Sequence, residues 1–309
     1  MAPTSHERIP LQEILQGLSQ DLRSELPAEI RLRRQIEAQG LIAKGPASAL
    51  RAECKALVGN FVGELLPAGG SLELSLISVQ VDDDAFARRR GIKLGLHVRL
   101  GVRAAPADPD SQHRVFVGAS AEDLGDPLLS RIASALARHD ARLTIHSIAG
   151  GLQLAHVYFP VINPSAAIKD ELRRGCGTVL FVDDDDALVD IHRRSIESMG
   201  YEVIECTEAT RALELVGRYP DDFDVVISDL GMPDMSGDEL ARRIRSVSPD
   251  LPVGLSTGLA VASGDMSAPG GEFEILLAKP FSLGELGDAL DTLRESRRGK
   301  GRKSDESAG

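Results

Sequence analysis

The chain has 309 residues, of which 42% are hydrophobic and 27% are charged. That length favours roughly two domains, and that composition is typical of soluble globular proteins. A formal net charge of -12 argues against nucleic-acid binding, because a DNA-binding surface has to be basic. The sequence contains no apolar run of the roughly 20 residues that span a bilayer, and its first residues lack a secretion signal. We therefore expect a cytoplasmic protein with neither a membrane nor a DNA partner.

The first half of the chain, about residues 10–163, predicts two helices and a mainly antiparallel sheet. Apolar and polar residues alternate in the predicted strands, which cover 29–38, 71–82, 92–104, 113–119 and a hairpin over 141–161 that turns at Gly150 and Gly151. The predicted helices cover 49–66 and 126–140, and one side of the first carries Leu50, Cys54, Leu57, Val58, Phe61 and Leu65. Helices grouped with such a sheet indicate an α+β sandwich.

The composition changes after this half. Residues 164–176 are charged and include Pro164 and Gly175, which predicts a linker. A second domain is predicted over 177–298. Residues 299–309 are rich in Gly, Lys and Ser, so we expect a disordered tail there.

Strand and helix signals alternate through the second domain. Apolar runs predict five strands, at 179–182, 201–206, 224–228, 252–256 and 274–278. Helical spacing places the following residues on common faces: Leu188, Ile191, Ile196 and Met199; Leu240, Ile244 and Val247; Leu283, Leu286, Leu290 and Leu293. Asp186 is a plausible N-cap of the first helix and Gly200 its end, and Asp185 is also interpreted as a cap or a solvated charge. The glycine-rich stretch 258–274 predicts a short or poorly ordered helix. Alternating strands and helices predict an α/β doubly wound parallel sheet with helices on both faces.

Chemically distinctive side chains follow four of these strands. Asp183 and Asp184 follow the first strand, Asp229 the third, Thr257 the fourth and Lys279 the fifth. Function in an open parallel sheet collects at the carboxyl ends of its strands. Neighbouring carboxylates repel one another unless a cation compensates, and Mg²⁺ prefers such oxygen ligands. A carboxylate beside Mg²⁺ is a suitable nucleophile for a phosphoryl donor, and a lysine and a hydroxyl could stabilise the transferred group.

These motifs resemble the receiver domain of two-component response regulators. The matching text is VLFVDDDDAL, DVVISDLGMPDMSG, PVGLSTG and AKPFSLGEL, within residues 177–298. The resemblance implies a flavodoxin-like five-stranded parallel sheet in the order 2-1-3-4-5. One position departs from the pattern, because Leu276 stands where many members carry Tyr or Phe. We therefore do not assign to this chain the output surface that is usual in the family.

The same resemblance assigns a role to each site residue. Asp229 would accept the phosphoryl group, and Asp183 and Asp184 would hold Mg²⁺ together with Asp229 and the backbone carbonyl of Gly231. Thr257 would be the switch hydroxyl. Lys279 would contact the phosphoryl group, and its bond to Pro280 is expected to be cis.

The first half resembles the Bergerat-type ATP-binding domain of sensor histidine kinases, through GPASALRAECKALVGNFVGELLPAGGSLELSL and LARHDARLTIHSIAGGLQLAHVYFPV. Its nucleotide motifs are largely missing. Phe61 stands where the family has a metal-binding Asn, with Asn60 one residue away, and 103–110 replaces the family's Asp-x-Gly-x-Gly motif. At 124–130, Pro127 and Leu128 would obstruct a close approach of backbone to phosphate. We therefore expect a degenerate domain without productive ATP binding.

A phosphoacceptor histidine is not expected in this chain. SHERIPL (5–11) is one residue too short for the kinase motif His-Glu-x-x-x-Pro-Leu, so His6 is interpreted as a tail residue. The other histidines show no ligand spacing and are interpreted as surface or core residues: His97, His113, His139, His146, His156 and His192.

The sequence as a whole predicts a two-component phosphorelay protein. Its receiver domain would take a phosphoryl group onto Asp229 from the phosphohistidine of a sensor histidine kinase or a histidine phosphotransferase. This step is Mg²⁺-dependent and self-catalysed, and no further enzyme activity is expected. The first domain would serve as a pseudokinase-like interaction domain. A truncated hybrid histidine kinase that retains ATP binding, and a scaffold with a structural receiver, are the alternatives; a homodimer stays open.

Overall fold

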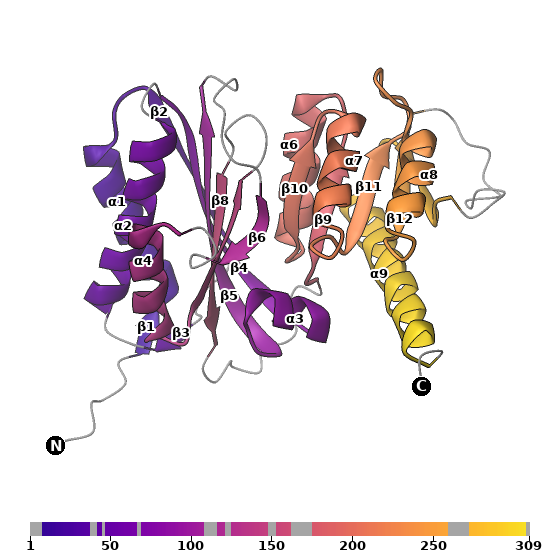
Figure 1. Ribbon diagram of the computed structural model, residues 1–309. Helices are drawn as coiled ribbons and strands as arrows, with labels where there is room; N and C mark the ends of the chain where they lie inside the picture. The colour runs from indigo at the N-terminus through magenta and orange to yellow at the C-terminus, as the bar shows by residue number, and fades with distance from the viewer. Residues whose placement is uncertain are drawn as a thin grey trace. The chain divides into compact units, whose positions relative to one another are not determined.

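The computed structural model describes residues 8–37, 42–44, 47–66, 69–107, 116–120, 125–147, 153–161, 175–258 and 272–306. By their internal contacts the residues form two compact units, Met1–Arg174 and Gly175–Gly309 (Figure 1). The division between them lies inside the predicted linker. None of the helices in the described ranges combines the length and the apolarity that crossing a bilayer requires.

The N-terminal unit is built on a six-stranded sheet in the order β2-β4-β5-β8-β7-β6. Its strands are β2 (Ile30–Ile36), β4 (Gly70–Val81), β5 (Gly95–Pro106), β6 (Phe116–Ser120), β7 (Arg142–Ser147) and β8 (Gln153–Pro160). β2 and β4 are parallel and the other neighbouring pairs are antiparallel, so the prediction of a mainly antiparallel sheet is confirmed. The short strands β1 (Arg8–Pro10) and β3 (Ile42–Lys44) form a separate antiparallel pair.

Three helices of this unit cover one face of the sheet, namely α1 (Leu11–Glu25), α2 (Ala47–Leu65) and α4 (Pro127–Ala137) (Figure 1). The predicted face of α2 is buried from Leu50 to Phe61, while the side chain of Leu65 lies outside the described residues. Burial raises the pKa of the Cys54 thiol to about 12, with a smaller contribution from Glu53. This thiol is therefore a neutral core side chain at neutral pH.

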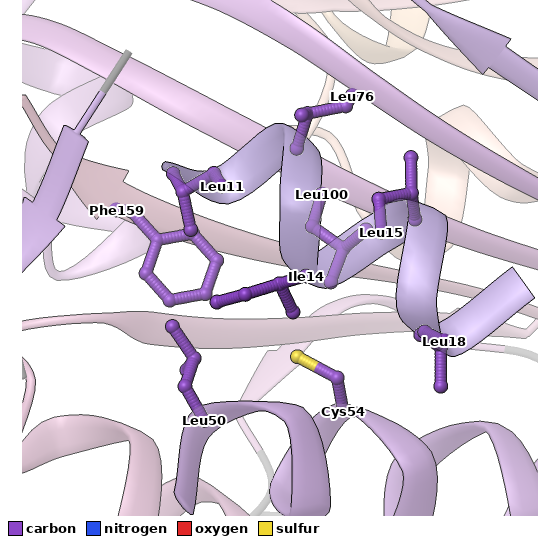
Figure 2. A pocket seen from close by; sticks show the side chains of 9 residues that line it. All are labelled: Leu11, Ile14, Leu15, Leu18, Leu50, Cys54, Leu76, Leu100 and Phe159. Atoms are coloured by element: carbon purple, nitrogen blue, oxygen red, sulfur yellow. The ribbon is translucent and has the colours of Figure 1, made fainter. Parts of the chain in front are cut away.

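Apolar side chains of α1, α2 and the sheet converge in the core of the unit (Figure 2). A small pocket there is lined by Leu11, Ile14, Leu15, Leu18, Leu50, Cys54, Leu76, Leu100 and Phe159. A ligand site normally adds a few polar groups to its apolar lining. Because the lining here is apolar throughout, we interpret the pocket as a packing gap of the core.

The C-terminal unit is a five-stranded parallel sheet in the order β10-β9-β11-β12-β13. Its strands are β9 (Thr178–Val182), β10 (Glu202–Cys206), β11 (Val225–Asp229), β12 (Val253–Thr257) and β13 (Ile275–Ala278). The helices are α6 (Asp186–Ser198), α7 (Ala209–Arg218), α8 (Gly237–Val247) and α9 (Leu283–Glu306). α6 and α9 pack on one side of the sheet, and α7 lies beside α8. The predicted doubly wound order 2-1-3-4-5 is confirmed.

The predicted helix faces were wrong at three positions. Ile191, Val247 and Leu283 were expected to face the core, but all three are exposed. The buried side of α6 includes the predicted Ile196 but also Val189 and Arg193, which were not predicted. Ion pairs allow the arginine head group to be buried, so the spacing of apolar residues alone could not locate this face.

Two further predictions were wrong at the ends of helices. The expected disordered tail from residue 299 is helical as far as Glu306, because extending an existing helix requires no new nucleus. Asp185, not Asp186, is the N-cap of α6: its Oδ1 accepts the N–H groups of Ala187 at 2.9 Å and Leu188 at 3.3 Å. Residues 259–271 lie outside the described ranges, so the prediction of a short helix there stays a prediction.

Removing this cap should weaken the C-terminal unit. We expect Asp185→Ala to lower the free energy of unfolding by about 1 kcal/mol, because two N–H groups lose their acceptor. Asp186→Ala is the matched control and should change it by less than about 0.5 kcal/mol. Urea denaturation followed by circular dichroism measures both variants, and equal losses would contradict the assignment of the cap.

Candidate functional site

The carboxyl edge of the parallel sheet brings together four of the predicted site residues. Asp183 follows β9, Asp229 ends β11, Thr257 ends β12 and Lys279 follows β13. The backbone pairing of β12 with β13 continues past the end of β13: the N–H of Lys279 donates to the carbonyl of Thr257 at 2.7 Å. The parallel register therefore places these residues side by side.

The Lys279 ammonium joins the two central acids. Its Nζ donates to Oδ2 of Asp183 at 2.6 Å and to Oδ1 of Asp229 at 2.5 Å. Asp183 is 1% exposed and Asp229 is 9% exposed, so water contributes little to neutralising either carboxylate. The lysine supplies the positive charge that buried carboxylates require.

Backbone groups hold the other oxygen of each acid. The N–H of Asp185 donates to Oδ1 of Asp183 at 3.1 Å, and the N–H of Gly231 donates to Oδ2 of Asp229 at 2.6 Å. Each carboxylate thus contacts the lysine through one oxygen and the loop after its own strand through the other. Both acids are oriented before any ligand arrives.

The electrostatics keep Lys279 charged. Burial lowers the pKa of this lysine, but its hydrogen bonds to Asp183 and Asp229 and their negative charges outweigh burial and raise it. Two carboxylates against one ammonium leave a charge of -2 + 1 = -1 at the site. Residual negative charge with oxygen donors is suited to a further cation.

Asp184 differs from the other two site acids in its exposure. It is exposed, and in the described ranges the carboxylate oxygens of Asp183, Asp184 and Asp229 do not all lie within 4.8 Å of one another. Mg²⁺ typically takes one or two protein carboxylates and keeps several waters. Two buried acids and an exposed third beside them therefore fit a magnesium ion.

Two further predictions concern the residues around the acids. The Lys279–Pro280 bond is cis, as the resemblance implied. Thr257 is buried at the end of β12, in register with Ala278 of β13. The hydroxyl therefore lies one strand from Lys279 on one side and one strand from Asp229 on the other.

Sequence patterns alone do not single out two residues that the structure places near these loops. His192 of α6 lies between the rings of Phe181 and Phe281. Asp234 follows Asp229 in the same loop and accepts the N–H of Thr210 at 2.9 Å at the start of α7. Both contacts join elements far apart in the chain, so local patterns contain no signal for them.

Comparison with known proteins identifies the C-terminal unit. Residues 179–291 match the family described as the response regulator receiver domain. The C-terminal unit is a response regulator receiver domain. This receiver domain belongs to two-component signalling, and the predicted recognition of residues 177–298 is confirmed to that extent.

The similar curated proteins match this receiver domain. Sensor kinase CckA of Brucella abortus (strain 2308) is 34% identical over 121 residues, which are 39% of this chain and 13% of that protein. Response regulator MprA of Mycobacterium leprae (strain TN) is 36% identical over 108 residues, 35% of this chain and 46% of that protein. CpdR of Brucella abortus is 29% identical over 115 residues, 37% of this chain and 94% of that protein. The chain spans less than half of CckA and MprA, so the matches concern one domain.

Solved receiver structures are also similar. The receiver domain of hybrid histidine kinase CckA is 26% identical, covers 38% of this chain and 99% of its own, and has a TM-score of 0.33. TrrA of Thermotoga maritima, crystallised with Mg²⁺-BeF, is 26% identical, covers 38% of this chain and 97% of its own, and has a TM-score of 0.34. These TM-scores are low, so the fold assignment rests on the strand order and the family match.

Proposed function

We propose that this protein is a two-component phosphorelay protein whose receiver domain accepts a phosphoryl group on Asp229. The observation that supports it best is the buried pair of Asp183 and Asp229 joined by Lys279 at the carboxyl edge of the sheet. A receiver domain implies a histidine kinase or a phosphotransfer protein as partner. The donor would be the phosphohistidine of such a partner.

The chemistry is a nucleophilic displacement at phosphorus. A carboxylate oxygen of Asp229 forms the new P–O bond while the P–N bond of the phosphohistidine breaks, and the imidazole leaves with the electron pair. Lys279 already lies 2.5 Å from Oδ1 of Asp229, so its positive charge would stabilise the phosphoryl oxygens. Thr257, at the end of the neighbouring strand, would donate a hydrogen bond to one of them.

Magnesium fits this proposal. Receiver domains generally depend on Mg²⁺, and here the ion would be held by Asp183, Asp184, Asp229 and the carbonyl of Gly231. When bound, it supplies positive charge that offsets the charge of the phosphoryl group. Asp183 and Asp229 are oriented for this by their backbone hydrogen bonds, so the protein spends little free energy on rearrangement.

The N-terminal unit is proposed to be a pseudokinase-like interaction domain. The N-terminus of a helix is the usual phosphate-binding position, but at α4 the Asp126 carboxylate already accepts the N–H groups of Leu128 at 2.7 Å and Leu129 at 3.0 Å. Phe61, at the position of the family's metal-binding Asn, is fully buried in the core. Both observations support a domain without productive ATP binding.

The alternative is a truncated hybrid histidine kinase that retains ATP binding. A titration of the full chain with a fluorescent ATP analogue separates the two proposals. No saturable binding is expected. Micromolar affinity would contradict the pseudokinase assignment and favour the alternative.

Acetyl phosphate tests the phosphoacceptor directly. With Mg²⁺ present, the parent chain should form an acid-stable, hydroxylamine-sensitive adduct, and Asp229→Ala should form none, because the nucleophilic carboxylate is missing. Asp221→Ala is the matched control, since Asp221 is exposed and precedes β11 at the opposite edge of the sheet. Intact-mass spectrometry measures the adduct. A parent chain that forms no adduct would support a structural receiver and overturn the proposal.

A further inference from the structure

Three aromatic rings lie in contact next to the phosphoacceptor site. The imidazole of His192 stacks on the ring of Phe281, with 4.5 Å between centroids and 29° between planes. The ring of Phe181 also contacts this histidine, with 5.4 Å between centroids and 46° between planes. Centroid separations of this size are those of favourable aromatic pairs. His192 therefore connects a phenyl ring of β9 with one from the segment that follows β13.

Each phenylalanine is two residues from a site residue. Phe181 lies on β9 and precedes Asp183, while Phe281 follows the cis Lys279–Pro280 bond after β13. Phe181 is fully buried in the sheet core, whereas Phe281 is only partly buried in a segment outside the strand. The first ring is thus held by the sheet. The second ring packs against the edge of that core and stacks on His192.

We propose that His192 is a positioning residue for Lys279: its ring holds Phe281 against the sheet and so fixes the segment that carries the lysine to Asp229. The inference rests on the proposed phosphorylation of Asp229. It assigns a role in that reaction to a histidine that the sequence pattern treats as an ordinary core or surface residue.

The electrostatics of His192 agree with this role. Burial lowers the pKa of the imidazole, the positive charge of Lys279 lowers it further, and Asp183 opposes both with a smaller effect. The ring is therefore neutral at neutral pH and does not repel the lysine.

A double-mutant cycle on the full chain tests the inference. The variants are His192→Ala, Lys279→Ala and the double variant, each phosphorylated with acetyl phosphate and Mg²⁺. A small misplacement of a catalytic group slows a reaction strongly, so we expect His192→Ala to slow phosphorylation about tenfold. Because His192 acts through Lys279, adding His192→Ala to Lys279→Ala should change the rate less than about twofold. Effects that multiply independently would overturn the inference.

Substitutions that keep or remove the ring separate positioning from folding. His192→Phe preserves the stack and should react within about threefold of the parent chain, while His192→Leu keeps apolar volume without the ring and should be slow. Equal rates for these two variants would overturn the inference even if His192→Ala failed to fold. Ile191→Ala, at an exposed neighbouring position of α6, is the control and should react at the parental rate.

The affinity for Mg²⁺ distinguishes a loss of positioning from a general loss of structure, because only the latter would weaken it. Calorimetric titration of His192→Ala should give a Kd for Mg²⁺ within about twofold of the parent, because Asp183 and Asp229 keep their backbone contacts. A parent chain that takes up no phosphoryl group would overturn both this inference and the proposed function. A parent chain that is phosphorylated, with a larger loss of Mg²⁺ affinity than of rate in His192→Ala, would overturn this inference alone.

Discussion

Replacing Lys279 with alanine should slow phosphorylation of Asp229 about 100-fold, as expected when a preorganised charge beside the reacting group is removed. The same change should tighten the binding of Mg²⁺. The ammonium takes one oxygen of Asp183 and one of Asp229, at 2.6 Å and 2.5 Å, and so competes with a metal ion for these acids. Without the ammonium, the net charge of the site formed by Asp183, Asp229 and residue 279 changes from -1 to -2. Phosphorylation should therefore slow while the affinity for Mg²⁺ rises.

Acetyl phosphate labelling gives the rate, and calorimetry gives the Kd for Mg²⁺. We expect the Kd to fall about tenfold in Lys279→Ala, which is the effect of one nearby charge in a partly buried site. Lys55→Ala is a matched control, since Lys55 also pairs with a carboxylate at 2.6 Å but is exposed and belongs to the N-terminal unit. Weaker Mg²⁺ binding in Lys279→Ala would show that the lysine does not compete for the acids.

Replacing Arg193 with alanine should destabilise the receiver domain by about 3–5 kcal/mol. Arg193 is 2% exposed and pairs with Glu197 at 2.6 Å and with Asp190 at 2.7 Å; its Nε lies 3.4 Å from Glu205. Removing the guanidinium leaves the buried Glu197 carboxylate without this partner. Loss of one member of a buried pair is far more harmful than loss of an exposed pair.

Arg194 offers the matched control for this prediction. It pairs with the same Asp190 at 2.8 Å, but its side chain is 39% exposed. Arg194→Ala should therefore lower the free energy of unfolding by less than about 1 kcal/mol. Urea denaturation of both variants measures the difference, and equal losses would contradict the assignment of a buried network to Arg193.

The destabilisation by Arg193→Ala should also depend on pH. Burial raises the pKa of Asp190, but hydrogen bonds and charges from Arg193 and Arg194 outweigh burial and lower it. A carboxylate with a lowered pKa stabilises the fold fully above its ordinary value of 3.8, and this contribution is lost as the pH falls through the folded-state pKa. The difference in the free energy of unfolding between the parent chain and Arg193→Ala should therefore become smaller in acid.

The receiver domain was predictable because its strands are short, apolar and regularly followed by helices. Each β-α unit satisfies its own local pattern, and the site residues follow directly after the strands. The sequence alone therefore predicts Asp183, Asp229 and Lys279 at one edge of the sheet. The role of the exposed Asp184 as a magnesium ligand stays a prediction.

The N-terminal unit was harder to predict. α1 (Leu11–Glu25) was not predicted, although Leu11, Ile14, Leu15, Leu18 and Leu22 have the spacing of a helix. α3 (Asp84–Arg90) has only 7 residues, too few for periodicity to show. The assignment of this unit to a family stays a proposal, since its resemblance rests on pattern and its chemical motifs are missing.

Periodicity, strand-end chemistry and turn residues were enough to predict the parallel sheet and the acids at its edge, since these signals act between residues close in the chain. The same signals could not bury Arg193 or bring Lys279 within hydrogen-bond distance of Asp183, 96 residues away. Those features, and the contact of His192 with Phe281, depend on how separate elements pack against one another. Packing between distant segments is a property of the folded chain and leaves no local mark on the sequence.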